Sequence, residues 1–130
     1  MADSAVGVVG RRVVLSANAQ VRVYLCTAPM DMRKGFDSLA SLVDHTLKLD
    51  PVSGHWFVFR NRKGDRVKVL CWDGSGLVLY YKRLDQGVFH WPRLDRGVIT
   101  LTPSELSLLI DGMDWRRLAK TQIVKPQKIA

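Results

Sequence analysis

Residues 60–68, "RNRKGDRVK", are the part of the chain best suited to binding an anion. The segment holds five cations and one acid. If residues 62–64 form a loop between two strands, Arg60 and Arg66 become cross-strand neighbours, and like charges directly opposite each other destabilise a sheet. A patch that repels itself suggests that an anion normally neutralises it. The alternative is that the charge keeps an exposed hairpin soluble and blunts edge pairing.

A second pair of cations stands at the start of a predicted helix. The segment "DMRKGFD" (31–37) opens an amphipathic helical pattern and carries Arg33 and Lys34. The N-terminus of a helix bears about half a positive charge, so cations are disfavoured there. Asp31 can cap the helix, and Asp37 adds an acid to its first turn. We predict that Arg33 and Lys34 join the helix dipole and backbone N–H groups in one anion site.

The whole chain has an excess of positive charge. It contains 20 Lys+Arg and 12 Asp+Glu, for a net charge of +8 and a pI near 9.9. Such an excess points to a polyanionic partner, either nucleic acid or an acidic protein surface. Lys68 shares a strand face with Arg66, and Lys82 and Arg83 end the next predicted strand. The predicted DNA-binding residues are Arg33, Lys34, Arg60, Arg62, Lys63, Arg66, Lys68, Lys82 and Arg83.

Aromatic residues are interleaved with these cations. Exposed rings beside arginines can stack on bases. Rings in an aromatic-rich sheet more often fill the core, so for any single ring we expect a core position. The rings in question are Trp56, Trp72, Tyr80, Tyr81 and Trp91.

The sequence offers few groups for catalysis. Its one glutamate, Glu105, is explained by a helix cap, and the aspartates mostly fall in turns or at helix ends. The chain contains no nucleophile elbow, no nucleotide-binding P-loop and no zinc-protease motif. We therefore predict that the protein is not an enzyme. A metal-dependent nuclease built on Asp31, Asp37 and Asp73 is the weaker alternative.

Metal and phosphate-loop sites are also disfavoured. Cys26 and Cys71 each lack a nearby partner and the three histidines are scattered, so we predict no metal site and no cofactor. Both thiols fit small buried side chains in a reducing compartment. The segment "DGSG" (73–76) resembles a phosphate-cradling loop, but no helical pattern follows it, so we interpret it as a hairpin turn.

The elements that must position these residues predict an α+β domain. A helix extends to about Leu49, and "TPSE" (102–105) has the capping box of a second, shorter helix. Because the glycine-containing spacers after residue 60 are short, we expect an antiparallel β-meander of about four to six strands with the longer helix packed on it. Apolar alternation places the strands at 21–27, 55–60, 65–72, 76–83, 88–91 and 98–101.

Length and composition indicate one domain. A chain of 130 residues with 47% hydrophobic residues can bury a core. We expect a loosely ordered extension at residues 1–20, a single domain at 21–117 and a basic flexible tail at 118–130. No apolar run approaches the ~20 residues that span a bilayer, so we predict a cytoplasmic protein without a membrane partner.

Several motifs together resemble one bacterial family. They are D-M-R-K-G-F-D at 31–37, F-R-N-R-K-G-D at 59–65, W-D-G-S-G-L at 72–77 and K-R-L at 82–84. Over residues 21–117 the chain is similar to the small accessory proteins called TnpB in transposons of the insertion-sequence sixty-six family. The resemblance implies a role in transposition beside a separate transposase that holds the catalytic carboxylates. It implies no catalytic residues in this chain.

The leading hypothesis from sequence is an accessory protein that binds DNA, at transposon ends or target, through the basic hairpin face. Phosphate contacts from arginine and lysine would supply most of the affinity. The competing hypothesis is a protein adaptor that binds the transposase without touching DNA. In that case the cations meet an acidic surface and the aromatic residues of the sheet act as anchors.

Overall fold

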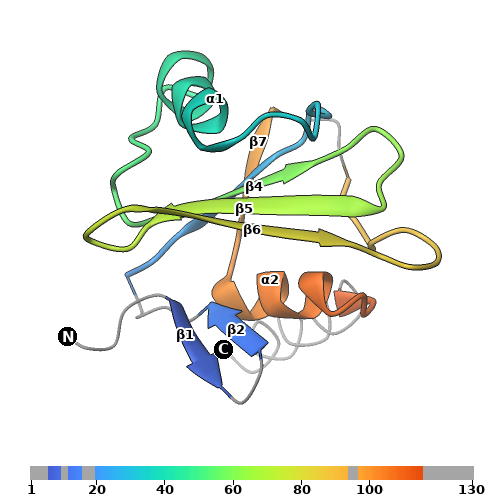
Figure 1. Cartoon of the computed structure of the whole chain (residues 1–130). Coiled ribbons are helices and arrows are strands. Elements are labelled where there is room, and N and C mark those ends of the chain that lie inside the picture. Colours follow the sequence, from blue (N-terminus) through green and yellow to red (C-terminus); the bar gives the residue numbers. More distant parts are fainter. Residues whose placement is uncertain (1–5, 10–11, 16–19, 94–96, 116–130) are drawn as a thin grey trace, which may run out of the picture.

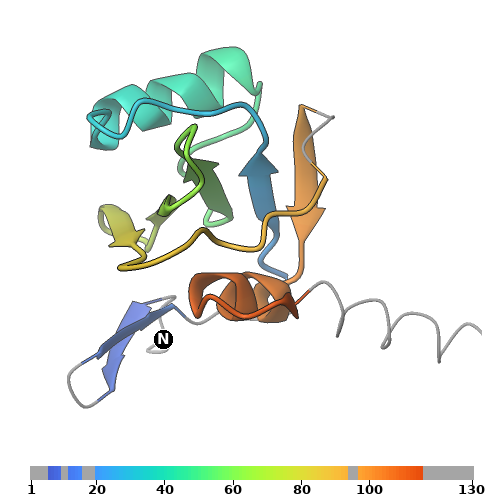
Figure 2. The same cartoon turned by 90° about the vertical axis from the view of Figure 1, so that its right-hand side faces the viewer.

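The computed structural model describes residues 6–9, 12–15, 20–93 and 97–115. Helices cover both faces of one five-stranded sheet (Figures 1 and 2). On one face lies α1 (Phe36–Ser41), which continues into the π-helical segment η1 (Leu42–Thr46), and on the other lies α2 (Pro103–Ile110). The strands are β3 (Val23–Cys26), β4 (Trp56–Arg60), β5 (Arg66–Trp72), β6 (Leu77–Arg83) and β7 (Val98–Leu101). This arrangement confirms the predicted α+β class.

The sheet has five strands, within the predicted four to six, and is mostly antiparallel, but it also contains one parallel pair that the predicted meander did not include. Its order is β6-β5-β4-β3-β7. β3 and β4 pair in parallel, with Leu25 opposite Val58, while the other neighbouring strands are antiparallel. A parallel pair needs a crossover of about a dozen residues or more, and α1 with η1 supplies it. The short spacers that indicate hairpins all follow residue 60, so they describe only β4, β5 and β6.

The predicted strand at 88–91 is not a strand. Phe89 is buried, and its backbone N–H donates to the carbonyl of Gly64. The apolar alternation of this segment therefore reflects one buried ring in an irregular connection, not sheet pairing. The predicted strand at 98–101 is confirmed as β7, which pairs with β3 at the edge of the sheet.

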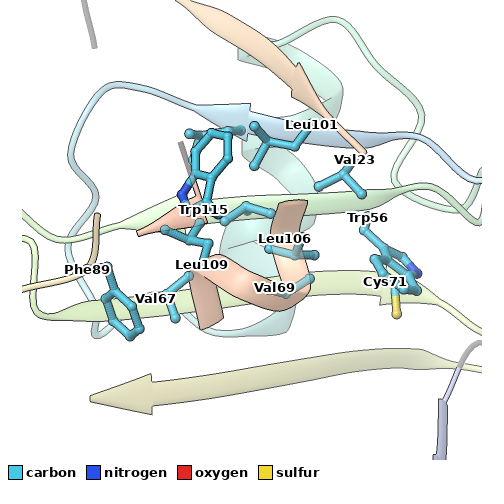
Figure 3. Close-up of a cluster of buried hydrophobic side chains, with 12 residues drawn as sticks. Val23, Trp56, Val67, Val69, Cys71, Phe89, Leu101, Leu106, Leu109 and Trp115 are labelled. Atoms are coloured by element: carbon cyan, nitrogen blue, oxygen red, sulfur yellow. The ribbon is translucent and has the colours of Figure 1, made fainter. Parts of the chain in front are cut away.

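The sheet separates two hydrophobic clusters. On the α2 side, alternate residues of β3, β4 and β5 pack with leucines of α2 and with Phe89 and Trp115 (Figure 3). On the α1 side, Phe57 and Phe59 of β4 pack with Leu39 of α1. Because β4 is covered on both faces, its residues from Trp56 to Phe59 are all buried. A continuous apolar run is typical of such a strand.

The two helices begin differently. In α2, Thr102 accepts a hydrogen bond from the N–H of Glu105, whose side chain accepts one from the N–H of Thr102, so the predicted capping box is confirmed. α1 begins at Phe36, and its N-cap residue, Gly35, makes no side-chain cap. Asp31 therefore does not cap this helix.

Outside the main sheet, β1 (Val6–Val9) and β2 (Arg12–Leu15) form an antiparallel pair within the predicted N-terminal extension. The predicted basic tail, 118–130, lies outside the described residues. Within the described part of the chain, no helix has the length and apolar character needed to cross a membrane.

Candidate nucleic-acid interface

The turn between β4 and β5 is braced by polar side chains at its base. The Asn61 Oδ1 accepts hydrogen bonds from the N–H groups of Gly64 and Arg66, each at 3.0 Å. The Asn61 Nδ2 donates to Asp65 at 2.7 Å, and this bond is the main reason why the pKa of Asp65 is lowered. Lys63 Nζ lies 3.8 Å from the Asp65 carboxylate. The turn is thus a fixed support for the exposed side chains at its tip.

A second segment fastens the same turn. Gly64 is buried at a φ of +86°, a left-handed conformation that favours glycine. Its carbonyl accepts hydrogen bonds from the N–H of Phe89 and from the Trp91 Nε1, both at 3.0 Å. A Cβ at position 64 would lie only 3.2 Å from the Trp91 Nε1. The motif therefore needs glycine for two reasons, and Trp91 fixes the turn instead of offering a free ring.

The register of the strands corrects the predicted pairing of Arg60 with Arg66. Arg60 lies opposite Val67, and Arg66 lies directly opposite Arg83 of β6. The loop is longer than the three residues assumed from sequence, which moves Arg66 out of register with Arg60. Two like charges do lie opposite each other in the sheet, but they are Arg66 of β5 and Arg83 of β6, on the α1 side.

Lys68 is the most buried of the predicted DNA-binding residues. Only 5% of it is exposed, and its ammonium donates to the carbonyls of Met32 and Lys34, both at 2.7 Å. Its Nζ also lies 4.5 Å from the centre of the Tyr81 ring. Lys68 therefore ties the loop before α1 to the sheet, and little of the residue is exposed.

The loop at 31–35 is organised by Asp31. Its carboxylate accepts hydrogen bonds from the N–H and the guanidinium of Arg33, and its carbonyl accepts from the N–H of Lys34. The Arg33 bonds lower the pKa of Asp31 to about 2. The N–H groups of Arg33 and Lys34 therefore already have acceptors within the loop. The Arg33 side chain itself is 91% exposed.

Two further cations are also bound to backbone carbonyls. The Arg60 Nε donates to the Thr27 carbonyl at 2.8 Å, and burial lowers the pKa of this guanidinium. Lys82 Nζ donates to the carbonyl of Ile110 at 2.7 Å, at the C-terminal end of α2, where a cation is favourable to the helix dipole. These contacts give Arg60 and Lys82 structural roles that the sequence did not reveal.

The predicted cations therefore fall into two groups. The anchored cations are Arg60, Lys68 and Lys82. The remaining ones lie in the β4–β5 turn, at the first residue of β5, at the last residue of β6 and in the 31–35 loop, which Lys68 ties to β5. The β4–β5 turn and the end of β6 lie at the same end of the sheet (Figure 1). We call this second group the open rim: Arg33, Lys34, Arg62, Lys63, Arg66 and Arg83.

Tyr81 is the one exposed ring among the aromatic residues singled out from sequence. It lies opposite Lys68 on β6 and is 47% exposed. Its hydroxyl accepts a hydrogen bond from Arg66 Nη1 at 2.9 Å. Trp56 is buried, and Tyr80 and Trp91 pack against the core. Core packing therefore explains most of these rings, as expected, and leaves Tyr81 beside the open rim.

Two of the three carboxylates of the weaker nuclease hypothesis, Asp31 and Asp73, have local partners. Asp31 pairs with Arg33, and Asp73 accepts from the N–H groups of Ser75 and Gly76, which lowers its pKa. This also confirms that "DGSG" is a hairpin turn. Across the residues that the structure describes, no three His, Cys, Asp or Glu side chains form a group suited to a metal ion. Both cysteines are buried and unpaired by disulfides.

Comparison with known proteins gives the same assignment over the whole domain. The family described as "IS66 Orf2 like protein" matches residues 21–120. The uncharacterized protein y4hO of Sinorhizobium fredii is 45% identical over 116 residues, which cover 89% of this chain and 99% of that protein. The uncharacterized protein y4jC of the same organism is 39% identical over 110 residues, covering 85% and 94%. No solved structure gives a significant match. The chain belongs to the IS66 Orf2-like family, the accessory proteins of IS66 insertion sequences.

Proposed function

We propose that this accessory protein acts in transposition by binding DNA, at transposon ends or target, through the open rim. The observation that carries the proposal is the pairing of Arg66 with Arg83. Two like charges directly opposite each other cost a sheet stability. Among the described residues neither arginine has a salt bridge to a carboxylate. A phosphate is the group that would turn this repulsion into attraction.

The geometry around the pair supports a preformed surface. The braced and fastened hairpin presents Arg62 and Lys63 beside the arginines, and Lys68 holds the loop of Arg33 on the same side. Because the supports are internal to the fold, little ordering of the backbone is needed on binding. The contacts available from such side chains are mainly to phosphates, which fix position without reading sequence.

A salt titration of binding to duplexes that carry the transposon ends tests the proposal. We expect affinity to fall steeply as salt rises, because each neutralised phosphate contributes a slope of about −0.9 in log K against log salt. Absence of measurable binding even at low ionic strength would contradict the proposal.

The adaptor hypothesis is the competing outcome. An adaptor would use the open rim against an acidic surface of the transposase and would not need DNA. A pull-down of the transposase, with and without nuclease treatment, separates the two. We expect any co-purification that depends on the open rim to disappear when DNA is digested. Survival of the complex after digestion would favour the adaptor.

A further inference from the structure

We propose that the open rim prefers single-stranded DNA and that Tyr81 is the platform on which an unpaired base stacks. This inference rests on the proposed function and names the form of DNA that the site takes. It starts from a ring that the fold holds in place but does not cover. A tyrosine ring normally gains stability by burial, yet Tyr81 is 47% exposed.

The ring is held from two directions. Lys68 Nζ lies 4.5 Å from its centre, and Arg66 Nη1 donates to its hydroxyl at 2.9 Å. Lys68 is itself fixed by two backbone carbonyls. An exposed ring that is already oriented loses little conformational freedom when a ligand stacks on it. Stacking is therefore less costly here than on a freely rotating surface ring.

The position of the ring suits a single strand. β6 is an edge strand of the sheet, so no further strand lies beyond Tyr81 in the described structure. Arg66 and Arg83 lie on the same face of the sheet as Tyr81 and are available for the backbone phosphates. Aromatic rings beside cations are the general means by which proteins bind single strands without sequence preference. In a duplex the flat faces of the bases are stacked on one another, and exposing one costs a few kcal/mol.

Phosphate contacts alone would favour the opposite choice. Duplex DNA carries more charge per unit length than a single strand, and its binding has a steeper salt slope, about −0.9 per contact against −0.7. A purely electrostatic rim should therefore bind duplex more tightly. Preference for the single strand would measure a contribution that salt does not screen, and stacking on Tyr81 supplies one.

The test measures binding of a labelled single-stranded oligonucleotide, and of the duplex made from it, over a range of salt. The variants are Tyr81→Leu, Tyr81→Phe and Phe36→Leu. Phe36 is a matched control because it is also 47% exposed but lies on α1. Thermal unfolding of each variant establishes that it is folded.

We expect the wild type to bind the single strand at least as tightly as the duplex. Tyr81→Leu should lower single-strand affinity by at least about fivefold at every salt concentration, without changing the salt slope. Its effect on the duplex should be smaller, and Tyr81→Phe, which keeps the ring, should retain most of the single-strand affinity. Phe36→Leu should leave both forms unchanged.

Two results would overturn the inference and leave the proposed function standing. One is tighter binding of the duplex at all salt concentrations. The other is a loss in Phe36→Leu as large as that in Tyr81→Leu, which would mean that any exposed ring has the same effect. Absence of binding to both forms would instead contradict the proposed function itself.

Discussion

Strands β5 and β6 place cations on the sheet, β5 on the α1 face alone and β6 on both faces, and these cations have different contacts on the two faces. On the α2 face, Lys82 closes the C-terminal end of α2 through the carbonyl of Ile110. On the α1 face, Arg66 and Arg83 lie opposite each other, and neither forms a salt bridge with a carboxylate of the described residues. The cation on the α2 face is thus bound by the fold, whereas the arginine pair on the α1 face has no acidic partner in the described part of the chain.

Lys68 shows where the boundary between these uses lies. It shares the α1 face with Arg66 and is only two residues away along β5, yet its ammonium is buried under two carbonyls. Two cations on the same face of one strand therefore differ in burial, because backbone carbonyls reach only one of them. The alternation of residues along β5 does not show which of its two cations is buried.

Of all the expected effects, the largest is the difference in reactivity of the buried thiols between the folded and the unfolded chain. Cys71 lies on the α2 face, and burial raises the pKa of its thiol to about 11. At pH 8 the folded protein should therefore contain about 100-fold less Cys71 thiolate than a thiol of ordinary pKa. Alkylation followed by mass spectrometry, in native and denaturing buffer, measures this. Rapid native labelling of Cys71 would show that the α2 face is open.

The second thiol compares the two faces directly. Cys26 lies on the α1 face, and its pKa is raised by burial but lowered in part by a backbone hydrogen bond with Ala28 and by the charge of Arg60. We expect Cys26 to react before Cys71.

A raised pKa in the folded state stabilises the fold fully below the unfolded pKa. This stabilisation disappears as pH rises through the folded value, about 11 for Cys71, so the protein should lose stability in strong alkali.

Replacement of Lys68 should have the largest effect on stability. Lys68→Met leaves the carbonyls of Met32 and Lys34 without their donor, and buried groups that lose a partner cost about 1–3 kcal/mol. We expect the free energy of unfolding to fall by about 2 kcal/mol or more in urea denaturation. An unchanged midpoint and slope would show that Lys68 is a surface cation and would place it back among the ligand-binding residues.

Lys82→Met should cost less, about 1 kcal/mol. Lys82 is only half-buried as a residue, and its ammonium bonds one carbonyl at a helix end, where water can replace it. The same denaturation series measures it beside Lys68→Met. If Lys82→Met lost more free energy of unfolding than Lys68→Met, the expectation that the more buried lysine contributes more stability would be wrong.

The rim arginines should have the smallest effect on stability. Arg66→Gln and Arg83→Gln remove a like-charge pair, so we expect the free energy of unfolding to stay within about 0.5 kcal/mol of wild type or to rise slightly. Denaturation at low salt measures this, because screening is weakest there. A loss comparable to that of Lys68→Met would mean that the pair supports the fold and is not kept for a ligand.

Local rules predicted much of the fold. The capping box from Thr102 to Glu105 and the turn at 73–76 were both recognisable, because hydrogen bonds within a few residues define them. The parallel pairing of β3 with β4 was not recognisable, since it depends on where a crossover helix packs. The segment at 88–91 was misread because one buried ring imitates the alternation of a strand.

The candidate site was predictable by residue type but not by role. Arg66 and Lys68 look equivalent in the sequence, since residues two apart on a strand lie on the same face. Their difference arises from the carbonyls of a loop more than thirty residues earlier in the chain. Likewise, the partner of Arg66 is set by strand register with β6, which no pattern within residues 60–68 fixes. Long-range backbone contacts decide both outcomes.

The most direct test of the account is the salt dependence of DNA binding in two matched double variants. Arg66→Gln with Arg83→Gln removes two rim cations. Arg22→Gln with Lys48→Gln removes the same charge from exposed positions outside the open rim, Arg22 before β3 and Lys48 after η1. We predict that the rim variant lowers the magnitude of the slope of log K against log salt by about 2, while the control leaves it close to wild type. Equal slopes in the two variants would mean that net charge, and not the arginine pair on the α1 face, binds the DNA.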